Sequence, residues 1–121
     1  MTIEAKIKKP YDLEERTLQF AKSIFDFINN LPKTITNTEI IKQVVRSSGS
    51  IGANYIEANE SLSKKDYFFR VKVCKKEAKE TIYWLRLLEL KSEAICLKRQ
   101  KMVVEATELM KIFGSIIEKS K

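Results

Sequence analysis

The feature that most constrains this chain is its shortage of residues that make turns. Among 121 residues there are three glycines and two prolines. A sandwich or barrel of short strands needs frequent turns, and glycine and proline supply most of them. The shortage therefore favours a few long helices, and the spacing of the apolar residues supports the same prediction.

The first helix is predicted to begin at Asp12, which can cap it together with Glu15 three residues later. Beyond the cap, residues recur at alternating steps of four and three, which places them on one face of a helix. These residues are Leu13, Thr17, Phe20, Ile24, Phe27 and Leu31. Pro32 follows and is expected to stop the helix, because its ring clashes with the preceding turn.

Two further helices are predicted in the middle of the chain. One runs from a cap near Thr36 to near Ser61, and its apolar spacing continues without a break. The next is capped by Ser63, with Asp66 three residues later, and reaches about Lys91. It is expected to be the longest helix of the chain.

The segment 92–97 is ambiguous between a turn and an early start of the last helix. That helix carries an apolar stripe composed of Met102, Ala106, Leu109, Phe113 and Ile116. Four amphipathic helices with short links predict an all-α fold, an antiparallel up-down-up-down four-helix bundle. Residues 1–11 are predicted to be a flexible basic lead-in, and residues 12–121 a single domain.

The charge and the side-chain inventory limit the function. The net charge is +7 and there is no histidine, so the commonest general base and metal ligand is missing. Cys74 and Cys96 are expected to be reduced and structural. We expect no cofactor, no metal, no enzyme activity and no membrane partner, and a cytoplasmic location. The charge indicates a polyanion or an acidic partner, unless it serves solubility alone.

The motif "GSIG" at 49–52 has two interpretations. A phosphate-binding or KH-type loop uses glycines, but each needs strands around it, and the residues before Ser47 have helical period. The alternative is a close approach of two helices at Gly49 and Gly52. Two glycines inside one helix each cost about 1 kcal/mol relative to alanine. Packing of a large side chain from a facing helix, Trp84 or Tyr83, would offset that cost.

Four polar residues have spacings that place them in pairs on two helices. Asn54 and Glu57 are three apart, and so are Glu77 and Glu80. We expect them to form one hydrogen-bonded cluster that fixes helix register or a subunit contact. Di-metal carboxylate sites in bundles also use paired glutamates, but they add histidines.

The third predicted helix carries most of the local positive charge. Residues 61–80 include seven Lys or Arg against three Asp or Glu. We call its candidate phosphate-binding residues the basic ridge: Lys65, Lys72, Lys75, Lys76, Lys79 and Arg86. Such a ridge suits contacts with a nucleic-acid backbone. The alternative is a solvated helix face, partly paired with Glu77 and Glu80.

The segments "SIGANYIEA" (50–58) and "SKKDYFFRVKVCKKEAKETIYWLRLLEL" (63–90) resemble the bacterial 23S rRNA intervening-sequence (S23) family. The resemblance implies a four-helix bundle that assembles as a ring, commonly a homopentamer. A related branch serves as accessory protein of diversity-generating retroelements, where the ring is thought to bind reverse transcriptase and nucleic acid. The family brings no catalytic residues. Its motif implies structural or interface roles for Gly52, Asn54, Glu57, Glu77, Glu80 and Trp84.

Two functions therefore remain open. The first is an oligomer that binds RNA or DNA through the basic ridge. The second is a structural adaptor that recognises an acidic protein such as a reverse transcriptase, and it predicts exposed apolar residues beside the lysines. A catalytic role for the glutamates is a distant third, which a bound metal or a deep pocket near Glu57 and Glu77 would revive.

Overall fold

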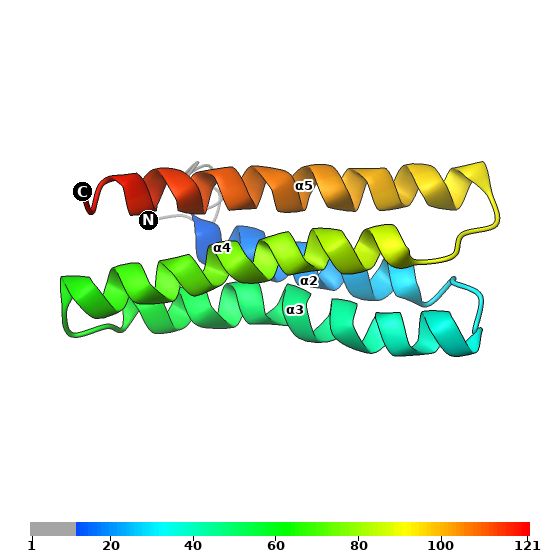
Figure 1. The fold of residues 1–121 in the computed structure, drawn as a ribbon, viewed down its shortest axis with the longest axis horizontal. Helices are drawn as coiled ribbons and strands as arrows, with labels where there is room; N and C mark the ends of the chain where they lie inside the picture. The colour runs from blue at the N-terminus through cyan, green and yellow to red at the C-terminus, as the bar shows by residue number, and fades with distance from the viewer. Residues whose placement is uncertain (1–11) are drawn as a thin grey trace, which may run out of the picture.

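The structure is a computed structural model, and it describes residues 12–121. Within them lie four helices and no strand: α2 (Leu13–Ile28), α3 (Ile35–Asn59), α4 (Lys64–Leu87) and α5 (Glu93–Glu118). Successive helices run antiparallel, and α4 lies between α3 and α5 (Figure 1). The all-α, up-down-up-down bundle predicted from the sequence is confirmed. The predicted lead-in, residues 1–11, lies outside the described residues.

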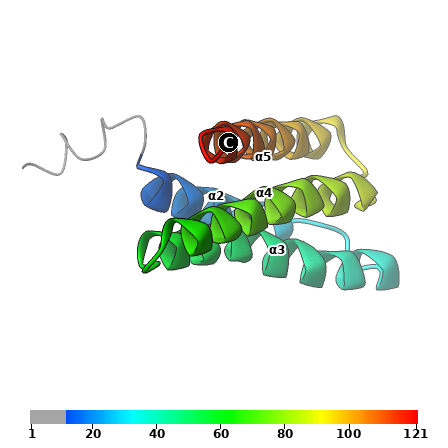
Figure 2. The same ribbon diagram turned by 60° about the vertical axis from the view of Figure 1, so that its left-hand side comes forward.

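Figure 2 shows the same helices from a second direction, with α5 seen nearly end-on. Each helix packs against the next in the chain, and α2 also contacts α5. The bundle is therefore closed by contacts between the first and last of these helices. Arg16 and Glu105 join them through two hydrogen bonds of 2.8 Å, from Nε to Oε2 and from Nη2 to Oε1.

Every one of these helices begins with a side-chain cap. Asp12 and Ser63 accept hydrogen bonds from the backbone N–H three residues later, at 3.2 and 3.1 Å, as predicted. The predicted start of α3 near Thr36 is wrong, since Thr34 accepts from the Asn37 N–H at 3.0 Å. Because threonines alternate along this segment, the capping pattern fits two starting points. Ser92 caps α5, which settles the ambiguous segment as helix.

Two helices end earlier than their apolar pattern. The last residue of α2 is Ile28, although Leu31 beyond it is still buried. Likewise, α4 ends at Leu87 and not near Lys91, because Leu88 takes an extended conformation. An apolar side chain in a link can cover the core as well as one in a helix, so burial alone does not mark helix ends. The longest helix is α5, with 26 residues against 24 in α4.

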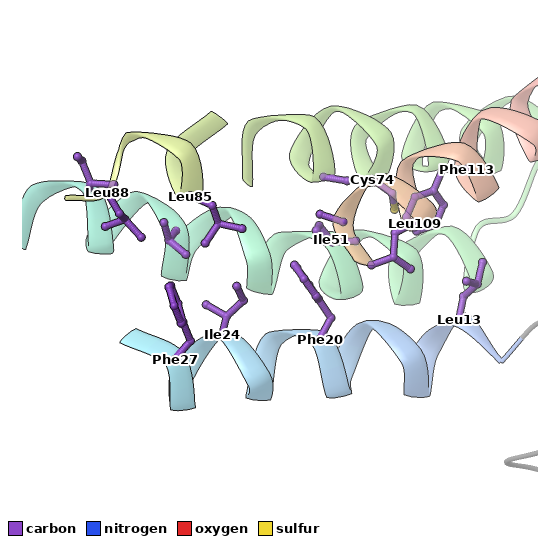
Figure 3. Close-up of a cluster of buried hydrophobic side chains, with 14 of the residues drawn as sticks. Leu13, Phe20, Ile24, Phe27, Ile51, Cys74, Leu85, Leu88, Leu109 and Phe113 are labelled. Carbon is purple, nitrogen blue, oxygen red and sulfur yellow. The ribbon is translucent and has the colours of Figure 1, made fainter. Parts of the chain in front are cut away.

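The core draws apolar side chains from all of the helices. Figure 3 shows Phe20, Ile24 and Phe27 of α2 pointing toward side chains of the other helices. The members on the remaining helices include Ile51 of α3, Cys74, Leu85 of α4, and Leu109 and Phe113 of α5. Fully burying a side chain of this size contributes about 1.5 to 3 kcal/mol. The core is therefore the main source of stability.

A small polar pair is buried among the apolar residues where α3 packs against α4. Ser47 and Thr81 are fully buried, and the Thr81 hydroxyl contacts the Ser47 hydroxyl at 2.8 Å. Thr81 also donates to the Glu77 carbonyl at 2.8 Å. Small side chains let two helices approach closely, and the hydroxyl pair satisfies the polar atoms that this approach buries.

Asn37 ties together two links of the bundle. Its side-chain amide donates to the carbonyl oxygens of Pro32, at 3.1 Å, and Glu89, at 3.0 Å. Its Oδ1 accepts from the Glu89 N–H at 2.8 Å. Asn37 is completely buried, so one side chain serves three backbone groups in the α2–α3 and α4–α5 links.

Candidate functional site

All six residues of the basic ridge lie on α4 with exposed side chains. Lys65, Lys72 and Lys76 follow the outer side of the helix, opposite its buried stripe. Lys75 leans toward α5, where its Nζ and Cε are the atoms closest to the position of a Cβ on Gly114. The ridge extends from Lys65 to Arg86, which at 1.5 Å per residue is about 30 Å.

The two glutamates of α4 contact an arginine of the neighbouring helix α3. The Arg46 guanidinium of α3 lies 3.3 Å from Glu77 Oε2 and 3.8 Å from Glu80 Oε2. Glu77 is buried, whereas Arg46 is about half exposed. Across residues 12–121, no ridge residue forms an ion pair. Of the alternative interpretation, the exposed helix face is present, but Glu77 and Glu80 contact Arg46 of α3, and Lys76 acts on Glu80 through its charge without forming an ion pair.

The two glutamates influence each other. Hydrogen bonding with the Glu77 carboxyl, together with burial and the Glu77 charge, raises the pKa of Glu80, while Lys76 and Arg46 oppose the shift. Two neighbouring carboxylates repel each other, so the folded state favours the protonated form of Glu80.

We predict a pH dependence from this pair. Because the folded state raises the pKa of Glu80, it binds a proton at higher pH than the unfolded chain does. The free energy of unfolding should therefore fall as the pH rises from the ordinary carboxyl pKa through the raised pKa of Glu80. Urea unfolding at a series of pH values should show this slope, and Glu80→Gln should flatten it. An unchanged slope in Glu80→Gln, or an equal effect of the exposed-residue control Glu57→Gln, would contradict the assignment.

The predicted four-residue polar cluster does not form. Asn54 accepts from Arg70 Nη1 at 3.0 Å and donates to the Ser50 carbonyl at 2.8 Å. Glu57 is exposed. The reason is the antiparallel pairing of α3 with α4. It sets Asn54, near the end of α3, beside the start of α4, and leaves Glu77 opposite Arg46 near the middle of α3.

The two glycines of "GSIG" lie inside α3, so neither forms a phosphate-binding loop. A Cβ on Gly52 would lie 2.8 Å from Thr17 Oγ1 on α2, whereas a Cβ on Gly49 would meet nothing within 4 Å. The close helix approach thus occurs at Gly52 alone. The prediction that Trp84 or Tyr83 faces Gly52 is wrong. Because α3 and α4 are antiparallel, those two residues lie beside the first half of α3, and Gly52 lies in its second half.

Trp84 lies instead beside Tyr83, with ring centroids 5.1 Å apart in an edge-to-face arrangement. Its Nε1 is buried and has no hydrogen-bond partner within the described residues. Burial raises the pKa of Cys74 to about 12, so this thiol does not ionise near neutral pH and is not an activated nucleophile.

Exposed apolar residues lie among the cations of α4, and sequence reasoning did not single them out. Phe69 and Tyr83 are each 59% exposed, and Leu62 and Leu87 are exposed as well. The helical period could have found the two rings, because steps of three and four connect Phe69 with Lys72, Lys76 and Tyr83 along one face.

Each ring lines a hollow with at least two cations. A groove of about 1020 Å³ lies where the α3–α4 link, the start of α4 and the end of α5 meet, and Phe69, Lys65, Lys72 and Lys119 line it. We call it the Phe69 groove. A smaller hollow of about 510 Å³, the Tyr83 hollow, is lined by Lys79, Ile82, Tyr83, Arg86 and Leu87.

Other site types find little support over residues 12–121. No group of three acidic or sulfur-bearing side chains there is arranged to hold a metal ion. None of the helices in that stretch combines the length and apolarity needed to cross a membrane.

Comparison with known proteins places the fold in a family. A model of the 23S rRNA-intervening sequence proteins matches residues 10–115. A crystal structure of a protein with unknown function from the S23 ribosomal protein family of Bacteroides thetaiotaomicron is 34% identical, with a TM-score of 0.73. The alignment covers 86% of this chain and 96% of that one. No curated protein matches the chain.

Proposed function

The chain belongs to the 23S rRNA-intervening sequence protein family, and from that premise we propose that it is a non-catalytic protein that binds the phosphate backbone of RNA or DNA through the basic ridge of α4. The observation that carries this proposal is the absence of ion pairs along the ridge within residues 12–121. Cations that are not held in an ion pair are available to bind phosphates, and they release condensed counterions when they bind.

The proposal is tested by the salt dependence of binding. Anisotropy of labelled structured RNA and duplex DNA is measured at low and near-physiological salt. For the triple variant Lys72→Glu, Lys76→Glu, Lys79→Glu, we expect the affinity at low salt to fall by about 100-fold. The slope of log K against log salt should flatten by about 3, as expected when three phosphate contacts are lost.

The matched control makes the same three charge reversals at lysines outside the basic ridge. Lys33→Glu, Lys42→Glu, Lys91→Glu reverses three exposed lysines that lie outside α4, and it gives the same net charge as the ridge variant. It should keep most of the affinity. Equal losses in both variants would reduce the effect to net charge. An absence of binding at low salt by a correctly assembled wild-type protein would reject the proposal.

A second candidate function is favoured by a separate observation. The exposed Leu62, Phe69, Tyr83 and Leu87 beside the lysines form the apolar-and-basic surface that an adaptor for an acidic protein, such as a reverse transcriptase, requires. This candidate predicts weak nucleic-acid binding, and binding of an acidic, leucine-containing peptide that Leu62→Ser and Leu87→Ser together abolish.

We also propose that the protein self-associates, in a ring of five copies, and repeats the basic ridge around the ring. Support comes from exposed apolar pairs seven residues apart, which lie on one side of each helix. They are Leu18 and Phe25 of α2, and Leu97 and Val104 of α5. Native mass spectrometry should show a single oligomer, which Leu18→Ser with Phe25→Ser should dissociate. A monomer at all concentrations would reject self-association.

A further inference from the structure

Resting on the proposed function, we propose that the outer face of α4 binds a single-stranded stretch of nucleic acid, with bases stacked on Phe69 and Tyr83 and phosphates held by the cations between them. This goes beyond backbone attraction, because it assigns the substrate a strandedness and assigns two aromatic residues a role. The exposure of the rings, the composition of the two hollows and the spacing of the rings along α4 support this assignment.

The exposure of the rings is the first step. Phe69 and Tyr83 each leave more than half of their surface in solvent, although other aromatic residues, such as Phe20 and Phe113, are buried in the core. Aromatic rings on a basic surface are the usual platforms for single-stranded bases, because every base has a flat face and stacking tolerates any sequence. A duplex keeps its bases stacked inside and does not offer them to such a ring.

The composition of the hollows is the second step. The Phe69 groove places a ring beside Lys65, Lys72 and Lys119, and the Tyr83 hollow places a ring beside Lys79 and Arg86. Both combine a flat apolar surface with cations, and so does each nucleotide with its base and phosphate. Carboxylates of an acidic peptide would meet the same cations, but they would not require a ring in each hollow.

The spacing is the third step. Phe69 and Tyr83 are fourteen residues apart on one side of α4, which corresponds to about 21 Å along the helix axis. Lys72, Lys76 and Lys79 lie between them. A strand running along α4 would therefore meet a ring, a row of cations and a second ring. Trp84 packs edge-to-face against Tyr83, so the second platform has a neighbouring ring that restricts its movement.

The test compares the binding of single-stranded and duplex DNA by variants that lose one ring and keep every charge. Binding of labelled dT oligonucleotides of about 4 to 16 nucleotides, the site sizes known for single-strand modules, is measured beside a duplex of matched length. Phe69→Leu and Tyr83→Leu should each weaken single-strand binding by about tenfold, the effect of losing one stacked base. Duplex affinity and the salt slope should stay unchanged, and Tyr83→Phe should behave as the wild type.

A second readout is built into the protein, because Trp84 is its single tryptophan. Unlabelled dT oligonucleotide should change Trp84 fluorescence through Tyr83, and Tyr83→Leu should remove that change. If the ring variants bind single strands as well as the wild type does, or lose duplex binding equally, the stacking inference fails while the proposed function stands. If the wild type binds no nucleic acid, both fail. A polyglutamate peptide that competes equally and depends on both rings would assign the face to acidic protein.

Discussion

Asn37→Ala should lower the free energy of unfolding by about 3 kcal/mol, since it leaves three partly buried backbone groups without their partner and a fully buried one costs about 1 to 3 kcal/mol. Asn37 is the shared partner of the Pro32 carbonyl and of both backbone groups of Glu89. Its loss therefore loosens two links at once. For a chain of this size the midpoint of thermal unfolding should drop by about 10 °C, which calorimetry measures directly.

Two further variants sharpen this prediction. Asn30→Ala removes an exposed asparagine from the α2–α3 link and should change stability by less than about 0.5 kcal/mol. Asn37→Asp keeps the acceptor for the Glu89 N–H but loses both donors, and it sets a carboxylate against two carbonyl oxygens. Protonation restores one donor, so this variant should become more stable as the pH falls. A stable Asn37→Ala, with the Glu89 amide still protected from hydrogen exchange, would contradict the assigned role.

Gly52→Leu and Gly49→Ala should change stability in opposite directions. At Gly52 even a Cβ would sit 2.8 Å from Thr17 Oγ1. That hydroxyl is fully buried and donates to the Leu13 carbonyl at 2.6 Å, so it cannot move aside. We expect Gly52→Leu to lower the free energy of unfolding by about 3 kcal/mol, the upper range for overpacking. Urea denaturation of both variants measures the two effects.

At Gly49 a Cβ would meet nothing, so Gly49→Ala should raise the free energy of unfolding by up to about 1 kcal/mol through helix propensity alone. Gly52→Ala should still destabilise, because the clash exceeds the gain in propensity. Thr17→Ala removes the closest atom and should rescue Gly52→Ala in a double-mutant cycle. If both alanine variants stabilise the protein equally, the close approach of α3 to α2 at Gly52 is wrong.

Local patterns explain which parts of the fold the sequence predicts well. The caps Asp12 and Ser63 act within one turn, and the stripe from Leu13 to Phe27 needs only the helical period. The start of α3 was misplaced because alternating threonines offer equivalent caps, and only the surrounding contacts select Thr34. The end of α2 was misplaced because Leu31 fills the core from outside the helix.

In the candidate site, too, features within one helix are predictable from the sequence, and contacts between helices are not. Helical period alone places the basic ridge on one helix. Whether those cations are neutralised depends on Arg46, which comes from another helix and reaches Glu77 and Glu80 across the α3–α4 seam. The partner of Gly52 and the failure of Asn54 to meet Glu77 depend equally on how α2, α3 and α4 are aligned. The spacing of residues within a single helix cannot predict how two helices are aligned.

The contact that closes the bundle also bears on how fast the chain folds. Most helix contacts join neighbours in sequence, a topology associated with rapid folding, but Arg16 and Glu105 are 89 residues apart. Because the two residues are so far apart in sequence, we expect their hydrogen bonds to form after the helices that are neighbours in sequence have paired. An interaction that is made late contributes little to the folding rate and mainly slows unfolding. We therefore expect the contact of Arg16 with Glu105 to slow the unfolding of the bundle more than it speeds its folding.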